Sequence, residues 1–169
     1  MEKSHRPLPN NRRDILFGLI AAFIVIADQI AKWAITHFVP ENTILWDLKL
    51  FRIIHITNTG VSFGLFKGYI WFIVVIVFIE MAVILYAVYL LRTRLSFLDS
   101  ILMRVGAGLV MGGAIGNQID RIIHQQVTDF IDFKIWPVWN VADMGAVIGT
   151  IIIAYCILFK SGLFKHKNG

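Results

Sequence analysis

The sequence predicts an all-α membrane protein with four transmembrane helices and a small extracytoplasmic subdomain of β-sheet and loop. Hydrophobic residues make up 57% of the 169-residue chain and charged residues only 16%, which is too apolar for an ordinary soluble domain. Four apolar runs are each long enough, as helices, to cross a hydrocarbon core of about 30 Å. Lipid offers no partners for open backbone groups, so helices are expected. We treat 1–169 as a single integral membrane domain with spans at about 15–38, 69–91, 98–116 and 138–159.

The basic residues lie mostly beside these spans and indicate their orientation. Those before the first span, between the second and third, and after the fourth are Lys3, Arg6, Arg12, Arg13, Arg92, Arg94, Lys160, Lys165 and Lys167. The connections 39–68 and 117–137 are longer yet carry fewer basic residues. By the positive-inside rule, both termini are predicted to be cytoplasmic and both longer loops extracytoplasmic. We therefore attribute the net charge of +5 to topology and expect no nucleic-acid partner.

The first span carries a charged pair, Asp28 and Lys32, at a spacing of four residues, which places both side chains on one helix face. Two interpretations remain open. The pair neutralises itself locally and merely tolerates lipid, or its face turns toward a polar cluster contributed by other spans.

The first outer loop has the character of a short strand followed by a turn. Residues 51–57, FRIIHIT, are rich in β-branched and aromatic residues, and Asn58, Thr59 and Gly60 have typical turn chemistry. A small extracytoplasmic sheet is therefore expected. Asn58 is either a turn residue alone or a site residue, and His55 is given no metal role.

The second and third spans differ in composition. Glu80 lies in the middle of the second span, and Arg104 in the third is its nearest conceivable partner, so Glu80 is interpreted as structural. The third span contains Gly108, Gly112 and Gly116 at four-residue spacing, which lets neighbouring helices approach closely. We predict that this span is central in the bundle.

A polar stretch between Gly112 and Gly145 contains the strongest candidates for a functional site. Asn117, Asp120 and Arg121 share one face at the end of the third span, and Asn140 and Asp143 share one face at the start of the fourth. Carboxylates beside lipid-length helices cost free energy unless they pair, face water or function. Both sets are expected near the outer membrane boundary, with Asp129 and Asp132 in the connection between them.

Two carboxylates held close together can perform acid–base chemistry, because one retains a proton while the other stays anionic. Such a pair can activate water against a peptide carbonyl without a nucleophilic side chain, a metal or a cofactor. The chain has no zinc-protease, serine-hydrolase or nucleotide-binding motif, its histidines are scattered, and its one cysteine, Cys156, is interpreted as an apolar filler. Chemistry alone leaves a second possibility open, a non-catalytic four-helix conductor of ions or protons.

Five motifs in order resemble those of the bacterial lipoprotein signal peptidases, also called signal peptidase II. They are Asp28-Gln29-x-x-Lys32; Asn58-Thr59-Gly60; Gly112-Gly113-Ala114-Ile115-Gly116-Asn117-x-x-Asp120-Arg121; Val127-Thr128-Asp129-Phe130; and Trp136-Pro137-x-x-Asn140-x-Ala142-Asp143. The ordered set is far more specific than any single motif, and it extends over nearly the whole chain.

The resemblance implies an intramembrane aspartyl endopeptidase that cleaves the signal peptide from diacylglyceryl-modified prolipoproteins just before the lipidated cysteine. Asp129 and Asp143 would be the catalytic pair. Residues that shape the site or hold substrate would be Asp28, Lys32, Asn58, Gly60, Asn117, Asp120, Arg121 and Asn140. Asp132 has no counterpart in the motifs and is interpreted as a solvated loop acid.

Several expectations about setting follow from the same resemblance. The protein would be a multi-pass monomer of the bacterial cytoplasmic (inner) membrane, in contact with membrane lipids, with its active site near the outer face and no cofactor or metal. A small extracytoplasmic sheet and a mobile outer helix are also implied. Val61 and Ser62 depart from the small residues that often follow Asn-Thr-Gly, which affects only local packing.

Overall fold

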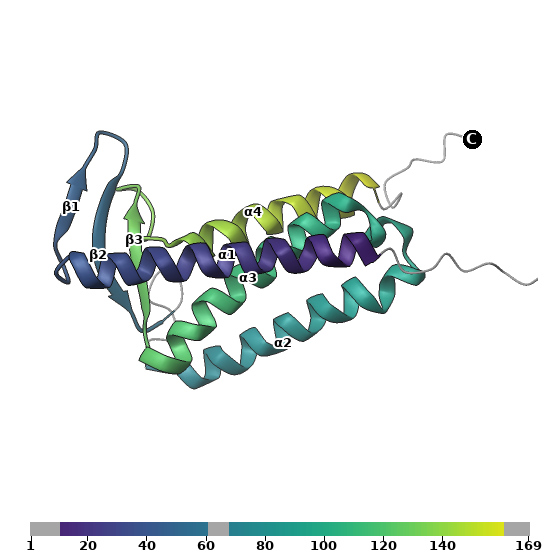
Figure 1. Ribbon diagram of the computed structural model, residues 1–169, viewed down its shortest axis with the longest axis horizontal. Helices are drawn as coiled ribbons and strands as arrows, with labels where there is room; N and C mark the ends of the chain where they lie inside the picture. The colour runs from purple at the N-terminus through teal and green to yellow at the C-terminus, as the bar shows by residue number, and fades with distance from the viewer. Residues whose placement is uncertain (1–10, 61–67, 161–169) are drawn as a thin grey trace, which may run out of the picture.

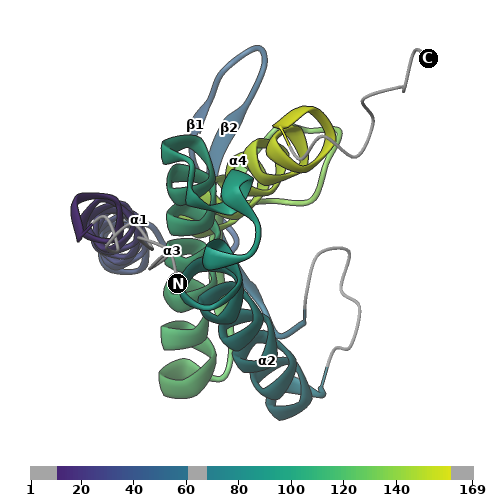
Figure 2. The same cartoon turned by 90° about the vertical axis from the view of Figure 1, so that its right-hand side faces the viewer.

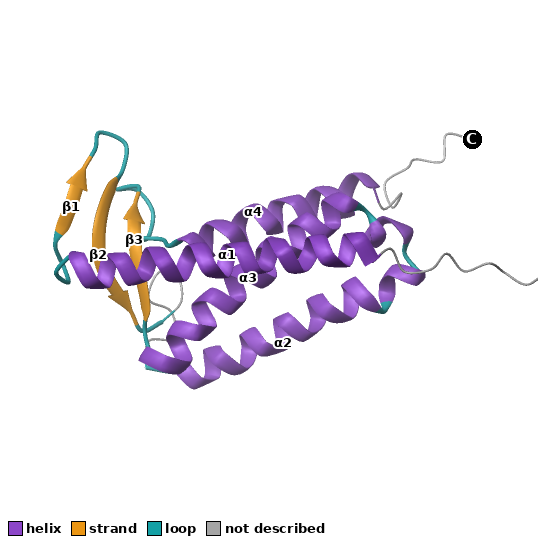
Figure 3. Cartoon of the chain, viewed as in Figure 1, coloured by secondary structure: helices purple, strands orange, loops and turns teal. Residues whose placement is uncertain are grey.

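The computed structural model describes residues 11–60 and 68–160 as a helical bundle with a small sheet across one end (Figure 1, Figure 3). The departure at Val61 and Ser62 lies outside the described residues. The helices are α1 (Asn11–Phe38), α2 (Ile70–Tyr89), α3 (Ile101–His124) and α4 (Val141–Tyr155), the last continuing as a π-helical turn, Cys156–Lys160. Short 3-10 helices, Leu91–Thr93 and Ser96–Asp99, connect α2 to α3.

Within the described ranges, three helical segments are long and apolar enough to cross a membrane: Arg12–Phe38, Ile70–Thr93 and Val141–Phe159. These correspond to the first, second and fourth predicted spans. The predicted start of the second outer loop at 117 is wrong, because α3 continues to His124 and ends at Gln125 in a left-handed conformation. The polar residues that suggested a loop, Asn117 among them, are buried against other elements, so they do not end the helix.

Helix α3 is central in the bundle, as its glycine spacing predicts, and it contacts each of the other three helices (Figure 2). A Cβ added at Gly112 would lie 2.7 Å from the carbonyl oxygen of Ala21 in α1, and one at Gly113 would overlap the carbonyl oxygen of Ala142 in α4. Any side chain at these two positions would therefore push the helices apart.

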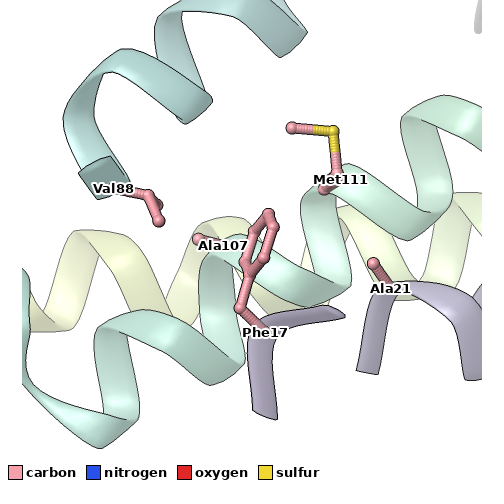
Figure 4. Close-up of a cluster of buried hydrophobic side chains, with 5 residues drawn as sticks. All are labelled: Phe17, Ala21, Val88, Ala107 and Met111. Carbon is pink, nitrogen blue, oxygen red and sulfur yellow. The ribbon is translucent and has the colours of Figure 1, made fainter. Parts of the chain in front are cut away.

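Helix α2 is attached to α1 and α3 through apolar packing. A buried cluster joins the three helices, formed by Phe17, Ala21, Val88, Ala107 and Met111 (Figure 4). Gln118 in α3 adds a hydrogen bond to the carbonyl oxygen of Val74, at 2.9 Å.

Arg104, the nearest conceivable partner of Glu80 in the sequence, pairs with other residues. Glu80 is exposed, whereas Arg104 is fully buried and donates to the carbonyl oxygen of Val88 at 2.7 Å. Its guanidinium lies 3.4 Å from a carboxylate oxygen of Asp14 and 3.3 Å from one of Asp99. These carboxylates lie at the same end of the bundle as Arg104, whereas Glu80 lies near the middle of α2.

The sheet is antiparallel, with strand order β1-β2-β3. Strand β2 (Arg52–Asn58) confirms the strand predicted for residues 51–57 and pairs with β1 (Ile44–Asp47). The third strand, β3 (Val127–Asp132), was not predicted. It lies in the stretch assigned to a loop, and its pairing with β2 places Asp129 opposite Ile56.

Asp132 is not a solvated loop acid. It is 4% exposed at the end of β3, and its carboxylate lies 2.6 Å from Nε of Arg52, the residue paired with it across the sheet. Burial raises the pKa of Asp132, but hydrogen bonds from the backbone N–H of Lys134 and from Arg52 outweigh this effect and lower the pKa below its usual value. Asp132 is therefore a structural residue that connects β2 and β3.

Candidate active site

The charged pair of the first span belongs to a larger buried cluster. Lys32 Nζ lies 2.7 Å from Asp28 Oδ2, 3.0 Å from Asp120 Oδ2 and 2.9 Å from Asn117 Oδ1. The local pair exists, and its face also turns toward the polar residues of α3, so the second of the two interpretations is confirmed. Two buried carboxylates share one ammonium group, which fixes α1 against α3 at this depth.

Asp28 also connects α1 to α4. Its second oxygen, Oδ1, accepts a hydrogen bond from the backbone N–H of Ala142 at 2.9 Å, in the first turn of α4. Gln29 supports the same region, because its side-chain amide donates to Asp120 Oδ1 at 3.1 Å and to the carbonyl oxygen of Gly116 at 3.2 Å. Sequence reasoning gave Gln29 no role, although it is part of the first motif.

Asn140 is the N-cap of α4 and connects the two candidate catalytic aspartates. Its Oδ1 accepts from the backbone N–H of Asp143 at 2.9 Å, and Asp143 Oδ2 accepts in return from the backbone N–H of Asn140 at 3.3 Å. Its Nδ2 donates to Asp129 Oδ1 at 2.7 Å. The fully buried Asn140 amide is thus oriented by both aspartates.

Asp143 lies in the first turn of α4, where the aligned peptide dipoles give the helix end a partial positive charge. Its Oδ1 also accepts a hydrogen bond from Nδ2 of Asn117 in α3, at 2.8 Å. Both features stabilise a negatively charged carboxylate at this position.

Asp129 reaches the same region from β3 and is only 4% exposed. Its Oδ2 accepts from Nδ2 of Asn58 at 3.2 Å, and Oδ1 of Asn58 accepts from the backbone N–H of Gly60 at 2.9 Å. Asn58 therefore serves both the turn and the site. Burial, and then the negative charge of Asp143, raise the pKa of Asp129 to about 7, although the hydrogen bonds from Asn58 and Asn140 act in the opposite direction.

A cavity of about 160 Å³ lies between these groups. It is lined by Asn58, Gly60, Asn117, Arg121, Val127, Asp129, Val138 and Asp143. The other predicted site residues lie behind this lining and hold it in place: Asp28, Lys32, Asp120 and Asn140. Sequence reasoning gave no role to Val127, although it begins the fourth motif, or to Val138, which directly follows Pro137 of the fifth motif.

Arg121 is the cationic group of the cavity wall. It is 7% exposed, and its Nε has no hydrogen-bond partner within the described part of the chain. A buried guanidinium with an unsatisfied N–H can donate to a carbonyl oxygen that enters the cavity. The arrangement therefore combines two carboxylates, amide donors and one cation around a small space that a peptide bond could enter.

Comparison with known proteins adds independent information. A family model described as signal peptidase (SPase) II matches residues 20–159. Lipoprotein signal peptidase of Bacillus velezensis is 37% identical over 159 residues, covering 90% of this chain and all of that protein. The lipoprotein signal peptidase of Moorella thermoacetica is 35% identical over 147 residues, covering 86% of this chain and 95% of that protein.

Two solved structures share the fold, each described as a bacterial membrane enzyme studied by the in meso method. The structure at 2.3 Å resolution has a TM-score of 0.77 and 29% identity, and the match covers 89% of this chain and 92% of that one. The structure at 1.9 Å resolution has a TM-score of 0.72 and 30% identity, over 83% and 91% of the two chains. By sequence and by fold, this chain belongs to the signal peptidase II family.

Proposed function

We propose that the chain is an aspartyl endopeptidase that removes the signal peptide from lipid-modified prolipoproteins, with Asp129 and Asp143 as its catalytic pair. The substrate class follows from the relatives, which are lipoprotein signal peptidases. One observation carries the catalytic assignment: aspartates from a strand and from a helix start line one cavity and share Asn140 as a hydrogen-bonding neighbour.

The two aspartates have unequal environments, which supports different starting protonation states for them. Asp143 lies at the positive end of α4 and accepts hydrogen bonds from Asn117 and Asn140, which favours the anion. Asp129 is buried in a strand, and its pKa is raised to about 7. Asp143 is therefore the base that receives a proton from water, and Asp129 is the acid.

The reaction then proceeds in two balanced steps. Asp143 takes a proton from water as the water oxygen bonds to the carbonyl carbon, and Asp129 gives its proton to the carbonyl oxygen, forming a gem-diol. Asp143 next protonates the leaving nitrogen while Asp129 takes a proton from one hydroxyl group, and the carbon–nitrogen bond breaks. Both aspartates return to their starting states, as acid–base catalysis requires.

Arg121 and Asn58 are proposed to position the substrate backbone. Both line the cavity and carry N–H groups. Donors of this type, fixed before substrate arrives, stabilise charge on a carbonyl oxygen more effectively than water does.

The proposed setting is a four-span monomer in the bacterial cytoplasmic membrane, with both termini cytoplasmic and the cavity near the outer face. We infer that α3 also crosses the membrane, as the third span in chain order. Its 24 residues reach about 36 Å, and its polar side chains face other elements. Cleavage just before the lipidated cysteine would keep the acyl chains in the bilayer while the scissile bond reaches the cavity.

Single substitutions of the two aspartates test the proposal. Asp129→Asn and Asp143→Asn should each reduce cleavage of a purified lipid-modified prolipoprotein by about 10²-fold or more, because each removes an obligatory proton carrier. Glu41→Gln is the control, since Glu41 is an exposed carboxylate that does not line the cavity. Folded Asp129→Asn or Asp143→Asn protein that retains near-normal cleavage would contradict the assignment.

A further inference from the structure

We propose that the sheet end of the molecule carries a phospholipid-binding patch that inserts into the headgroup region of the bilayer and sets the depth of the cavity. The patch consists of Leu48 and Leu50 in the turn between β1 and β2, and Ile135 and Trp136 in the connection from β3 to α4. Its lipid binding does not depend on catalysis, whereas its effect on cleavage rests on the function proposed above.

The patch is unusually apolar for a surface loop. Leu48 is 49% exposed, Leu50 79%, Ile135 84% and Trp136 58%. Isolated apolar residues are normal on protein surfaces, but a contiguous group marks an interaction site.

Two charged contacts hold the separate segments of the patch together. The ammonium group of Lys134 pairs with the carboxylate of Asp47 and donates to the carbonyl oxygen of Leu48 at 2.9 Å. These contacts bring together segments 86 positions apart in the chain. The two loop segments that carry the four apolar side chains therefore lie side by side.

The position of the patch identifies a bilayer as its partner. The strands cross the end of the bundle, and the turn between β1 and β2 extends past α4, on the same side as the connection from β3 to α4 (Figure 1, Figure 2). That connection leads directly into a candidate span, Val141–Phe159. At the same end of α1, Trp33 is 60% exposed and Phe38 68%, as expected of aromatic residues at a membrane boundary.

The charges around the patch suit a phospholipid surface. Asp47 is neutralised by Lys134, and Asp132 by Arg52, so these carboxylates are paired. Lys49 is exposed between the two leucines and can reach a phosphate group. Apolar side chains next to a flexible cation are the usual composition of an interfacial segment.

An aromatic column connects the patch to the cavity. The ring of Phe133 lies 6.4 Å from that of Phe51, beside the β1–β2 turn, and 6.0 Å from that of Trp139. Trp139 is fixed by backbone hydrogen bonds to Ile131 and directly precedes Asn140, which contacts both aspartates. Ring packing and backbone hydrogen bonds therefore join the patch to the start of α4, which carries Asp143.

Spin labels on single cysteines test the lipid contact. Leu50→Cys and Ile135→Cys should place a nitroxide that, in phosphatidylcholine vesicles, collides more with oxygen than with a water-soluble nickel chelate. Glu41→Cys, at an exposed position three residues before β1, is the control, and its label should collide more with the nickel chelate than with oxygen. The native cysteine, Cys156, is fully buried and should take up little label. Labels at 50 and 135 that are as accessible to nickel as the label at 41 would overturn the lipid contact.

Cleavage measurements test the effect on depth. Leu50→Ser combined with Ile135→Ser should slow cleavage in vesicles by about three- to tenfold and leave cleavage in detergent micelles unchanged, because micelles impose no fixed depth. Leu45→Ser, an exposed apolar residue of β1 outside the patch, should match wild type in both media. Equal rates for the double variant and wild type in vesicles would overturn the depth effect. Absence of cleavage by every protein, wild type included, would count against the proposed function and leave the label result intact.

Discussion

At the scale of single residues, Asn140 has the most demanding position in the site. Its side-chain oxygen, Oδ1, caps α4. Its side-chain nitrogen, Nδ2, donates to Asp129 Oδ1, to Asn117 Oδ1 and to the backbone carbonyl oxygen of Thr128. These contacts fix the orientation of the amide. No other natural side chain of similar size offers both an acceptor and a donor in this arrangement.

Asn140→Asp should therefore separate the two roles of this residue. An aspartate can still cap the helix, so the thermal unfolding temperature should fall only modestly. It cannot donate to Asp129, and it adds negative charge beside the pair, so cleavage should fall by about 100-fold. Near-normal cleavage with an unchanged unfolding temperature would show that the donated hydrogen bond is not required.

Asp129 should control the alkaline limb of the pH–rate profile. Its ordinary pKa is 3.8, and the folded protein raises this value to about 7. Cleavage should decline as pH rises through about 7, because the acid loses its proton. Rates measured from pH 5 to pH 9 in detergent would check this, and a constant rate across pH 7 would contradict the assignment of Asp129 as the acid.

The same raised pKa has a consequence for stability. Between pH 4 and pH 7 the folded protein binds a proton at Asp129 that the unfolded chain does not, so the free energy of unfolding decreases as pH rises through this window. Asp129→Asn cannot titrate, so it should gain stability relative to wild type over the same window. Parallel unfolding temperatures for the two proteins from pH 4 to pH 8 would contradict this expectation.

Lys32 should be required for folding because it neutralises two buried carboxylates. Lys32→Met leaves Asp28 and Asp120 without their cation, and we expect a loss of about 3–5 kcal/mol in the free energy of unfolding. Arg94→Met removes an exposed cation and is the control. Thermal unfolding in detergent would measure both, and equal stability of the two variants would contradict the structural role of Lys32.

At the scale of elements, local patterns predict some segments well and others poorly. The four-residue spacing of Asp28 and Lys32, and the β-branched run in β2, are local signals, and both predictions were confirmed. The strand β3 was missed because its stability comes from pairing with β2, about 70 residues earlier in the chain. The burial of Asp132 was missed for the same reason, since Arg52 reaches it only across that pairing.

The end of α3 shows a different difficulty. Polar residues near a membrane boundary resemble a loop in the sequence, but here Asn117 and Asp120 face Lys32 from α1. Whether a polar side chain contacts water or a buried partner depends on the tertiary structure and not on the local sequence. The sequence motifs indicated which residues to consider, and the packing of the elements determines which line the cavity and which support it.

Gly113 should be irreplaceable where α3 meets α4. Gly113→Ala places a methyl group against the carbonyl oxygen of Ala142, and we expect a loss of about 2 kcal/mol or more in the free energy of unfolding. Gly18→Ala is the matched control, since a Cβ at Gly18 in α1 has no neighbour within 4 Å and alanine favours the helix. Unfolding temperatures that rank Gly113→Ala at or above Gly18→Ala would contradict the close packing.

At the scale of the whole molecule, the cavity depends on elements from both ends of the chain. Helix α1 supplies Asp28 and Lys32, the first loop supplies Asn58, and the last quarter of the chain supplies the aspartate pair. The elements lie on either side of α3, which explains why this helix contains the small residues that permit close approach.

The orientation of the whole molecule can be tested by accessibility. A cysteine at Gln125, which is exposed at the end of α3, should react with a membrane-impermeant maleimide added outside intact cells. A reporter fused after Lys160 should report a cytoplasmic position, as the distribution of basic residues predicts. External reporter activity, or protection of the residue 125 cysteine, would reverse the proposed topology.

The hydrogen bond from the backbone of Ala142 to Asp28 spans 114 positions of the chain, and it connects the order of synthesis to the onset of activity. A nascent chain exposes Asp28 early, and the start of α4 that this carboxylate contacts emerges 114 positions later, together with Asp143. Under the function proposed above, Asp129 therefore lacks its partner until α4 inserts beside α1 and α3. We expect the growing polypeptide to be inactive toward other membrane proteins and to become active when the bundle closes.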